Sequence, residues 1–392
     1  MNSFKKFQQK LGNLKPAKHR AEAEELNRDL NEVYAWNKFR MTDQPIRVAL
    51  IVRDGLWWPK SSAFVRLLSP LTSPGLQGEI GLRILGEDTV DIGDANICLV
   101  QRNAYDDIQS AKELVSYLRE RKIPLIVDTD DAFHDIDKSH PEYNLQRQRL
   151  DAFEFLIASA QQIWVSTPRL AKYFKKETKA EVRVILNSLD KRLWYSNKES
   201  AMTKKPLRII YMGTGSHDAD FEMLRPSLRE LAVAYPKSFE LTLIGAVSKP
   251  VDEPWLKRLV QPPFMGSLYL KFVPWFLEQG PFDIGLAPLV NSEFNRSKSD
   301  IKCLDYLAAG ILPVVSDVEP YKSVELSSFI IRVENSQDGW LNTLTELVKN
   351  KKGSSQKNTK IVKAGQNYLW SERNSTETGQ QLYRLLQRVI RV

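Results

Sequence analysis

Cysteine is nearly absent from this sequence of 392 residues, which contains only Cys98 and Cys303. Two thiols so far apart exclude a disulfide-stabilised scaffold and favour buried, reduced side chains over a metal-binding pair. Long apolar runs are missing as well, because no stretch approaches the ~18 consecutive apolar residues that a membrane-spanning helix requires. The first residues are positively charged but lack the apolar segment of a secretory signal peptide. We therefore expect a cytoplasmic protein.

The remaining composition is typical of a globular protein. Hydrophobic residues make up 42% of the chain and charged residues 27%, which excludes a disordered chain or a fibrous repeat and provides material for packed cores. The chain is also too long for a single compact core, because a domain usually holds about 100 to 200 residues. We expect two domains.

The net charge of +8 is concentrated in two segments. Residues 1–20 carry six basic residues and residues 349–363 carry six lysines, and neither segment contains an acidic residue. The rest of the chain is therefore mildly acidic, with a net charge of −4. A protein that binds nucleic acid along its fold needs a continuous basic groove rather than two basic appendages. Nucleic acid is not an expected partner.

The N-terminal arm, residues 1–41, begins with an amphipathic pattern. Phe4, Phe7, Leu11 and Leu14 recur at helical spacing, with lysines between them. A basic helix with such an apolar stripe suits an anionic membrane surface, and it would hold the protein peripherally on the cytoplasmic face of the inner membrane. The alternative is a helix that packs on its own domain, and the sequence does not decide between the two.

Short apolar runs follow the arm in two sets. The first set covers residues 46–52, 95–100, 124–128, 163–166 and 182–186, and the second covers 207–212, 239–244, 283–289, 312–316 and 329–333. Runs that are apolar throughout are typical of strands buried on both faces of a parallel sheet, and helical patterns lie between them. Strand–helix alternation repeated in this way predicts an α/β protein with two Rossmann-like, doubly wound domains facing a cleft.

The boundaries of these domains follow from the same pattern. The N-terminal domain covers residues 42–190, a polar linker covers 191–206, and the C-terminal domain covers 207–370. A last helical segment covers 371–392. Ligands of open parallel sheets bind beyond the carboxyl ends of the strands, so the cleft between the domains is the expected site.

A polar loop followed by a helix in the C-terminal domain is the first candidate site. The loop carries Asn295, Lys298 and Ser299, and Lys302 lies at the start of the helix. Free N–H groups at a helix N-terminus, supplemented by two lysines, form a cradle for a diphosphate. Asp305, one turn further, is placed to accept hydrogen bonds from a ribose diol. The alternative is an ordinary solvated loop.

A second candidate site follows the strand at 207–212. Gly213 and Gly215 let the backbone turn tightly and approach a ligand closely. His217 suits a hydrogen bond to a phosphate or a sugar hydroxyl, although a lone loop histidine is more often a surface residue. The segment is not a complete G-x-G-x-x-G fingerprint, because Asp218 stands where the third glycine is expected.

These two segments together resemble the C-terminal half of retaining GT-B glycosyltransferases of family four, and most closely the bacterial members that build surface polysaccharides. The matching motif residues are Gly213, Thr214, Ser216, His217 and Asp220 in the first segment, and Phe294, Asn295, Lys298, Ser299, Tyr306, Ala308 and Gly310 in the second. The resemblance extends into the N-terminal half, where it is weaker.

The resemblance implies a GT-B fold, a nucleotide diphosphate sugar as donor, retention of anomeric configuration, and a terminal helix that crosses back to the N-terminal domain. It also implies that Lys298 contacts the donor diphosphate and that Asp305, in place of the usual glutamate, holds the ribose. The family's upstream glutamate is missing, with Ser297 or Lys298 near its position. The predicted donor site comprises Gly213, Thr214, Gly215, His217, Asn295, Lys298, Ser299, Lys302 and Asp305.

A cluster of acidic residues, Asp128, Asp130 and Asp131, ends a buried strand of the N-terminal domain and so faces the cleft. One interpretation is the metal-binding D-x-D of the other main glycosyltransferase fold, in which aspartates hold Mg²⁺ or Mn²⁺ on the diphosphate. The other is a sugar- or acceptor-facing site in an enzyme that needs no metal. We favour the second, because the phosphate-binding features lie in the other domain. Asp130, Asp131 and Lys298 are then the candidate catalytic residues.

Candidate acceptor-side residues also lie in the N-terminal domain. In many members of the resembled family a histidine stands near the donor sugar, and here Asp130 takes its position with His134 close by. Trp57 and Trp58 suit stacking on a sugar or a lipid-linked acceptor, or packing as core residues under their loop. Arg66 lies on a helix that starts at the cleft and suits a phosphate.

The predicted function is transfer of a sugar from a nucleotide diphosphate sugar, such as dTDP-rhamnose or GDP-mannose, to a saccharide or lipid-linked saccharide. O-antigen, capsule or lipopolysaccharide synthesis is the expected setting, and no metal cofactor is expected. Two alternatives remain: a nucleotide-sugar epimerase on the same fold, and a non-catalytic nucleotide-sugar-binding partner in a polysaccharide-synthesis complex.

Overall fold

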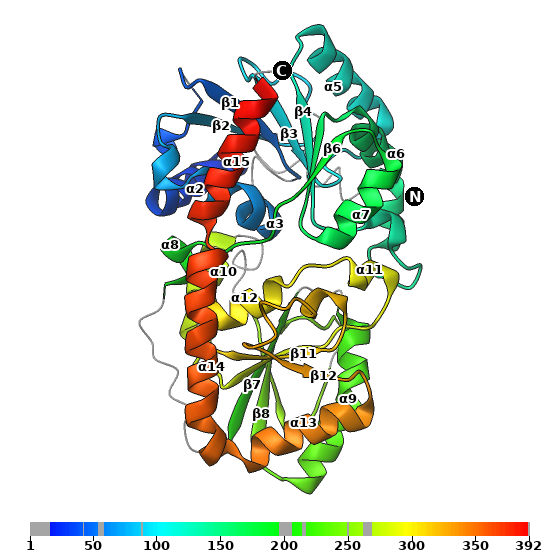
Figure 1. Ribbon diagram of the computed structural model, residues 1–392, viewed down its shortest axis with the longest axis vertical. Coiled ribbons are helices and arrows are strands. Elements are labelled where there is room, and N and C mark those ends of the chain that lie inside the picture. The colour runs from blue at the N-terminus through cyan, green and yellow to red at the C-terminus, as the bar shows by residue number, and fades with distance from the viewer. Residues whose placement is uncertain are drawn as a thin grey trace.

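We describe a computed structural model of the chain. The described residues are 16–41, 43–53, 59–87, 89–195, 206–213, 217–248, 251–261 and 269–390. The chain forms two lobes, each built on a parallel sheet, stacked along the long axis of the molecule (Figure 1). The α/β class and the two sheets predicted from the sequence are confirmed.

The N-terminal lobe contains a six-stranded sheet in the order β2-β1-β3-β4-β5-β6. Its strands are β1 (Ile46–Ile51), β2 (Ile80–Leu85), β3 (Ile97–Gln101), β4 (Leu125–Thr129), β5 (Gln162–Val165) and β6 (Glu181–Val184). Every residue of the central strands β3, β4 and β5 is buried, because helices cover both faces of the sheet. The edge strand β2 was not among the predicted strands.

The C-terminal lobe repeats this design with the strand order β12-β11-β10-β7-β8-β9. Its strands are β7 (Leu207–Gly213), β8 (Phe239–Gly245), β9 (Leu256–Leu259), β10 (Ile284–Ala287), β11 (Leu312–Ser316) and β12 (Ile331–Val333). The strand order reverses between β10 and β7, so the loops that follow these two strands diverge at their carboxyl ends. This divergence opens the place where a ligand of such a sheet binds.

Helices connect the strands of both sheets. In the N-terminal half they are α2 (Pro16–Tyr34), α3 (Ser61–Ala63), α4 (Ser69–Leu71), α5 (Ile108–Glu120), α6 (Tyr143–Ser159), α7 (Pro168–Glu177) and α8 (Lys191–Trp194). In the C-terminal half they are α9 (Asp218–Ala234), α10 (Tyr269–Gln279), α11 (Glu293–Arg296), α12 (Ile301–Ala308), α13 (Gln337–Lys349), α14 (Lys351–Glu372) and α15 (Ser375–Ile390). A π-helical turn, Phe64–Leu68, joins α3 to α4.

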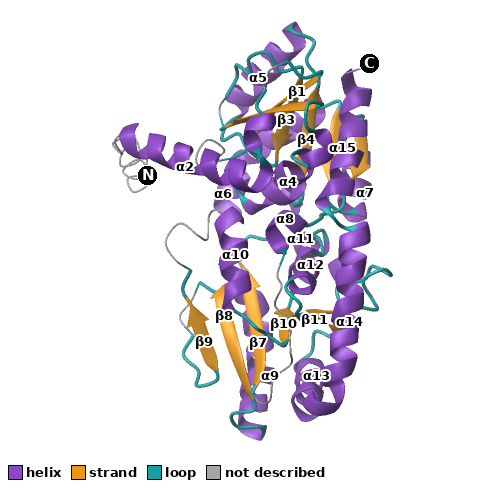
Figure 2. Cartoon of the chain, turned by 90° about the vertical axis from the view of Figure 1, so that its left-hand side faces the viewer, coloured by secondary structure: helices purple, strands orange, loops and turns teal. Residues whose placement is uncertain are grey.

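The last two helices join the lobes. The long helix α14 runs beside the C-terminal lobe, and α15 continues from it along the N-terminal lobe (Figures 1 and 2). Gly379 of α15 packs so closely on α4 that a Cβ at this position would lie 2.3 Å from the carbonyl oxygen of Pro70. Helix α15 is therefore the helix that crosses back to the N-terminal lobe. The lysine-rich segment 349–363 forms the end of α13 and the first half of α14.

The N-terminal arm includes α2, whose first half projects sideways from the lobe (Figure 2). Leu26, Leu30 and Tyr34 of α2 are buried against the body of the protein. Lys271 of α10, in the other lobe, pairs with Glu25 and lies 3.4 Å from Asp29. This part of the arm therefore docks on both lobes, while the apolar stripe from Phe4 to Leu14 lies outside the described residues.

Candidate functional site

The two lobes meet at the carboxyl ends of their strands, around the loop that precedes α12. Thr167, which caps α7, donates its hydroxyl to the main-chain oxygen of Ser297 at 3.2 Å. Asn187 of the N-terminal lobe donates its amide to Ser299 Oγ at 2.8 Å. The predicted phosphate loop is therefore held between the lobes, at the place where parallel sheets bind ligands.

Helix α12 is fixed to the N-terminal lobe at its start. Asp300, the residue before α12, forms two 2.8 Å hydrogen bonds with the guanidinium of Arg373, which lies at the junction of α14 and α15. The same Arg373 donates Nε to the main-chain oxygen of Asn187, also at 2.8 Å. Because Asn187 also contacts Ser299, a single segment of the N-terminal lobe sets the position of the α12 N-terminus.

Lys302 and His217 form one network under the carboxyl end of β7. His217 Nδ1 lies 2.7 Å from a carboxylate oxygen of Asp220, and its Nε2 lies 3.3 Å from Lys302 Nζ. Lys302 also donates to the main-chain oxygen of Met212 at 3.0 Å. Burial and the charge of Lys302 lower the pKa of His217 to about 4, so the ring is neutral, donates to Asp220 and accepts from Lys302.

Gly213 packs directly against the side chains of Lys302 and His217. A Cβ at this position would lie 2.9 Å from both Lys302 Nζ and His217 Cδ2, so a larger residue would displace the lysine. Both ring nitrogens of His217 therefore have partners within the protein. The ring positions Lys302 and is not free to bind a ligand. Two further residues predicted for this glycine loop, Thr214 and Gly215, lie outside the described residues.

Lys298 is half-buried, with Nζ 5.1 Å from the ring centre of Phe294. Within the described part of the chain, no carboxylate forms an ion pair with Lys298. Its charge is therefore available to an anionic ligand at the junction of the lobes. Asn295 and Ser299 have structural partners instead: Asn295 donates its amide to the main-chain oxygen of Val290 at 2.9 Å, and Ser299 accepts from Asn187.

Asp305 follows Lys302 by one turn on α12. Burial raises the pKa of Asp305 to about 8, although the charge of Lys302 opposes the shift. The folded protein therefore keeps a proton on this carboxyl group at neutral pH, where the unfolded chain has lost it. Holding Asp305 in this place therefore costs stability at pH values above the pKa of the unfolded carboxyl group.

Asp305→Asn should therefore raise the melting temperature by about 2 to 4 °C near pH 8. Because the pKa of Asp305 is higher in the folded state than in the unfolded chain, this residue reduces the free energy of unfolding. The reduction grows as pH increases from the unfolded-state pKa of 3.8 to the folded-state pKa of about 8. Near pH 4 the gain should largely disappear, because the unfolded chain is then also partly protonated. Calorimetric scans at both pH values test this. An equal gain at both values would show that the carboxyl charge is not its cause.

The acidic cluster of the other lobe is organised by an arginine. Arg102 Nη1 lies 3.3 Å from Asp130 and Nη2 lies 2.6 Å from Asp131. Arg102 directly follows β3 and has a left-handed backbone conformation, with φ of 60°, which is strained for a residue other than glycine. Arg102 was not among the predicted site residues, although it is the first charged residue after a fully buried strand.

Asp130 retains free hydrogen-bonding capacity. Its Oδ1 atom is buried and accepts no hydrogen bond of good geometry, although Arg102 Nη1 lies 3.3 Å from it as an ion pair, and burial raises the pKa of Asp130. A buried acceptor held only by this long contact would be stabilised further by a ligand hydroxyl.

His140 was not among the predicted site residues, and it contacts the other lobe. Its ring centre lies 5.4 Å from that of Phe294. Burial and the nearby charge of Lys298 lower the pKa of His140, while the carboxylates of Glu142, Asp131 and Asp220 oppose the shift. His140 therefore lies where the cationic loop of one lobe meets the acidic cluster of the other.

His134, by contrast, packs against α7. Its ring stacks on Tyr173 of α7 with a centroid distance of 3.5 Å, and it meets Phe174 edge-on. These contacts do not test whether His134 lines the acceptor side, which stays a prediction. Trp57 and Trp58, predicted for the same side, lie outside the described residues.

Arg66 differs from its predicted role as a phosphate ligand. Its side chain is 1% exposed, and Nε and Nη2 bind the carboxylate of Asp128 at 2.6 to 2.9 Å. Nη1 donates to Asn187 Oδ1 and to the main-chain oxygen of Ile185, each at 2.9 Å. All three guanidinium nitrogens of Arg66 therefore bind groups of the protein and are not available to a phosphate. The bond to Asn187 fixes that side chain, which in turn contacts the loop of Lys298.

Metal ligands are not clustered in the described part of the chain: no group of three His, Cys, Asp or Glu side chains is placed to hold an ion there. Asp130 and Asp131 already face Arg102, and Asp128 faces Arg66. None of the helices among the described residues is long and apolar enough to cross a membrane.

Comparison with known proteins gives a result at the level of fold. No protein-family model matches the sequence, and no curated protein matches it. Among solved structures, a sucrose-phosphate synthase from Thermosynechococcus elongatus has a TM-score of 0.60 at 11% identity, covering 88% of this chain and 99% of that one.

Two further solved structures match over a similar length. HepE of Anabaena, solved in complex with UDP-glucose, has a TM-score of 0.58 at 11% identity and covers 88% of this chain and 100% of its own. A glycosyltransferase from Rickettsia africae has a TM-score of 0.56 at 9% identity, with 89% and 99% covered. Identities this low establish the fold alone. The chain has the two-domain α/β architecture called GT-B, as the sequence resemblance implied.

Proposed function

We propose that this protein is a glycosyltransferase that moves a sugar from a nucleotide diphosphate sugar to a hydroxyl of a saccharide or lipid-linked saccharide. The observation that supports this most is that charged residues of both lobes act on His140. Burial and Lys298, in the loop before α12, lower its pKa and Asp131 of the N-terminal lobe opposes the shift, so the lysine loop and the acidic cluster both lie near this ring. HepE, which shares the fold, was solved with UDP and with UDP-glucose, which supports a nucleotide sugar as ligand.

In this proposal the diphosphate binds to the C-terminal lobe. The charges of Lys298 and Lys302 and the N-terminal end of α12 stabilise the negative charge that grows on the departing diphosphate. Because His217, Asp220 and Met212 already hold Lys302 in place, little reorganisation is needed when the bond breaks. Asp305 holds the nucleotide ribose.

The sugar then lies towards the N-terminal lobe, beside Asp130. Its carboxylate accepts a hydrogen bond from the sugar and stabilises positive charge on an oxocarbenium-like ring, while Asp131 and Arg102 fix its position. We propose retention of configuration by front-side attack, in which the departing phosphate takes the acceptor proton. The two lysines and the helix N-terminus supply the positive charge that a metal ion would otherwise provide.

A panel of radiolabelled UDP-, GDP- and dTDP-sugars, incubated with and without lipid-linked oligosaccharide acceptors, tests the function. Transfer that requires an acceptor supports the proposal, and dTDP-rhamnose and GDP-mannose are the first donors to try in a surface-polysaccharide setting. Conversion of the sugar without an acceptor would identify an epimerase instead. Binding of a donor with neither transfer nor conversion would identify a non-catalytic partner.

Donor affinity should fall as pH rises above neutrality. Burial lowers the pKa of Lys302 to about 8, so the free protein loses this charge at higher pH and must regain a proton to bind a diphosphate. From about pH 7 to about pH 9 the affinity for a nucleotide sugar should fall about tenfold. Calorimetric titrations measure this, and Lys302→Arg, which keeps its charge, should flatten the profile. An unchanged slope in that variant would place the titrating group elsewhere.

A further inference from the structure

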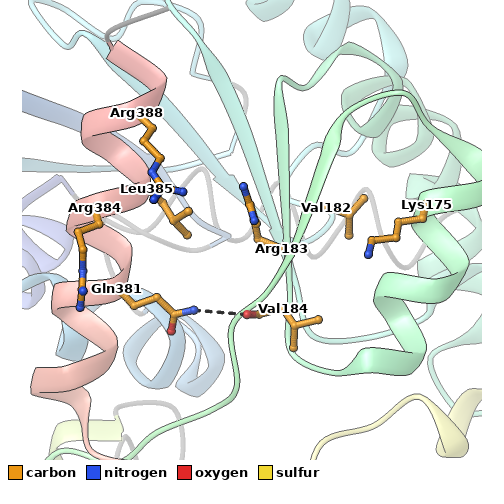
Figure 3. A pocket seen from close by; sticks show the side chains of 8 residues that line it. All are labelled: Lys175, Val182, Arg183, Val184, Gln381, Arg384, Leu385 and Arg388. Atoms are coloured by element: carbon orange, nitrogen blue, oxygen red, sulfur yellow. Dashed lines mark hydrogen bonds between the residues drawn. The ribbon is translucent and has the colours of Figure 1, made fainter.

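A basic hollow of about 680 Å³ lies on the N-terminal lobe between α15, the edge strand β6 and α7 (Figure 3). Its lining residues are Lys175, Val182, Arg183, Val184, Gln381, Arg384, Leu385 and Arg388. Four of these side chains are cationic and none is acidic. The hollow is formed by segments distant in sequence, so the fold itself gathers these charges.

The positive charges in this hollow are poorly compensated by the protein. Arg384 and Arg388 are both exposed and stand four residues apart on α15, an arrangement in which like charges destabilise a helix. Within the described residues, no carboxylate forms an ion pair with Lys175, Arg384 or Arg388. Arg183 pairs through Nη2 with Glu181, but its buried Nε has no hydrogen-bond partner. An anion would satisfy both the charges and this donor.

The walls of the hollow indicate what kind of anion fits. Arginine guanidinium groups bind phosphate oxygens in pairs, which gives geometric specificity as well as affinity. Apolar surface comes from Val182, Val184 and Leu385. Gln381 lines one side of the hollow and donates a hydrogen bond to the main-chain oxygen of Val184 at 3.5 Å. The volume lies in the range of about 300 to 1,000 Å³ that suits an organic ligand rather than a bare ion.

We propose that this hollow binds a phosphate ester, with Arg183, Arg384 and Arg388 on the phosphate and the aliphatic side chains against the organic part. The site goes beyond the proposed sugar transfer, because it lies between β6, α7 and α15 and not at the loop of Lys298. A bound phosphate would tie α15 to β6 and so strengthen the attachment of the crossing helix. The ester is supplied either by the headgroup of an anionic phospholipid or by a soluble metabolite.

Two arms of one experiment test the site and separate these sources. Full-length protein is titrated calorimetrically with glycerol 3-phosphate, and it is co-sedimented with vesicles of phosphatidylglycerol or of phosphatidylcholine. The test variant is Arg384→Gln with Arg388→Gln. The control is Lys112→Gln with Arg119→Gln, two exposed positions on α5 that remove the same charge. All proteins also carry Lys298→Ala, which weakens phosphate binding at the proposed donor site equally in the test and control variants.

If the hollow binds a phosphate ester, the test variant should bind glycerol 3-phosphate or phosphatidylglycerol vesicles at least about tenfold more weakly than the control does. A loss confined to phosphatidylglycerol vesicles identifies the lipid, and a loss confined to glycerol 3-phosphate identifies a soluble ester. Equal binding by the two variants in both arms, or no binding by the control in either, would overturn the proposal. Neither outcome depends on whether the protein transfers sugar.

Discussion

Lys298→Ala should lower kcat/KM for sugar transfer by about a thousandfold, with the melting temperature unchanged. The lysine is a cation without a carboxylate partner in the described structure, and it lies at the junction of the lobes beside Phe294. Its loss removes charge stabilisation where the diphosphate departs, and it leaves no buried group unpaired. Initial rates over a range of donor concentrations measure both kcat and KM.

The matched control for this variant is Arg296→Ala. Arg296 is the last residue of α11, two positions before Lys298, and carries the same charge, but it bonds to Asn291 at 2.7 Å and to Glu293 at 2.5 Å. It should retain activity within about threefold, because its charge is already compensated at the surface. If both variants lost activity equally, general loop disruption would explain the result. If Lys298→Ala turned over normally, the site assignment would be wrong.

Arg66→Met should lower the free energy of unfolding by about 3 to 5 kcal/mol. The change leaves the carboxylate of Asp128, whose side chain is 0% exposed, without its partner in the interior. Asn187 Oδ1 and the main-chain oxygen of Ile185 lose a donor at the same time. Urea unfolding followed by circular dichroism gives the change in stability.

Two further variants show whether the buried pair is the cause. Arg66→Met combined with Asp128→Leu should recover much of the loss, because no unpaired charge then remains. Arg229→Met removes an arginine whose side chain is 55% exposed and should cost less than about 1 kcal/mol. A loss in Arg66→Met as small as that in Arg229→Met would mean that Asp128 is solvated or protonated at little cost.

The strands that the sequence predicted are largely those buried on both faces. The fully buried strands β3, β4 and β5 appear as apolar runs because every side chain meets a helix. The two strands missed, β2 and β9, lie at sheet edges and keep exposed or partly exposed residues. Leu256–Leu259 has two exposed basic residues between partly buried leucines, so its short pattern does not indicate a buried strand.

The candidate site was predictable where it depends on local geometry. Lys298, Lys302 and Asp305 follow from a loop and the start of a helix, which the local sequence specifies. The partners of Arg66 and His217 depend on residues brought together by the fold, and sequence spacing gives no sign of them. Arg102 and His140 were missed for the same reason, since their importance comes from what the other elements place beside them.

We propose that the C-terminal lobe binds the donor diphosphate by its lysines and helix N-terminus alone. Titration of the unaltered protein with UDP, GDP and dTDP in excess EDTA, and again with Mg²⁺, tests it most directly. We predict that at least one nucleoside diphosphate binds with the same affinity in both conditions. Binding that appears only when Mg²⁺ is present would contradict the account.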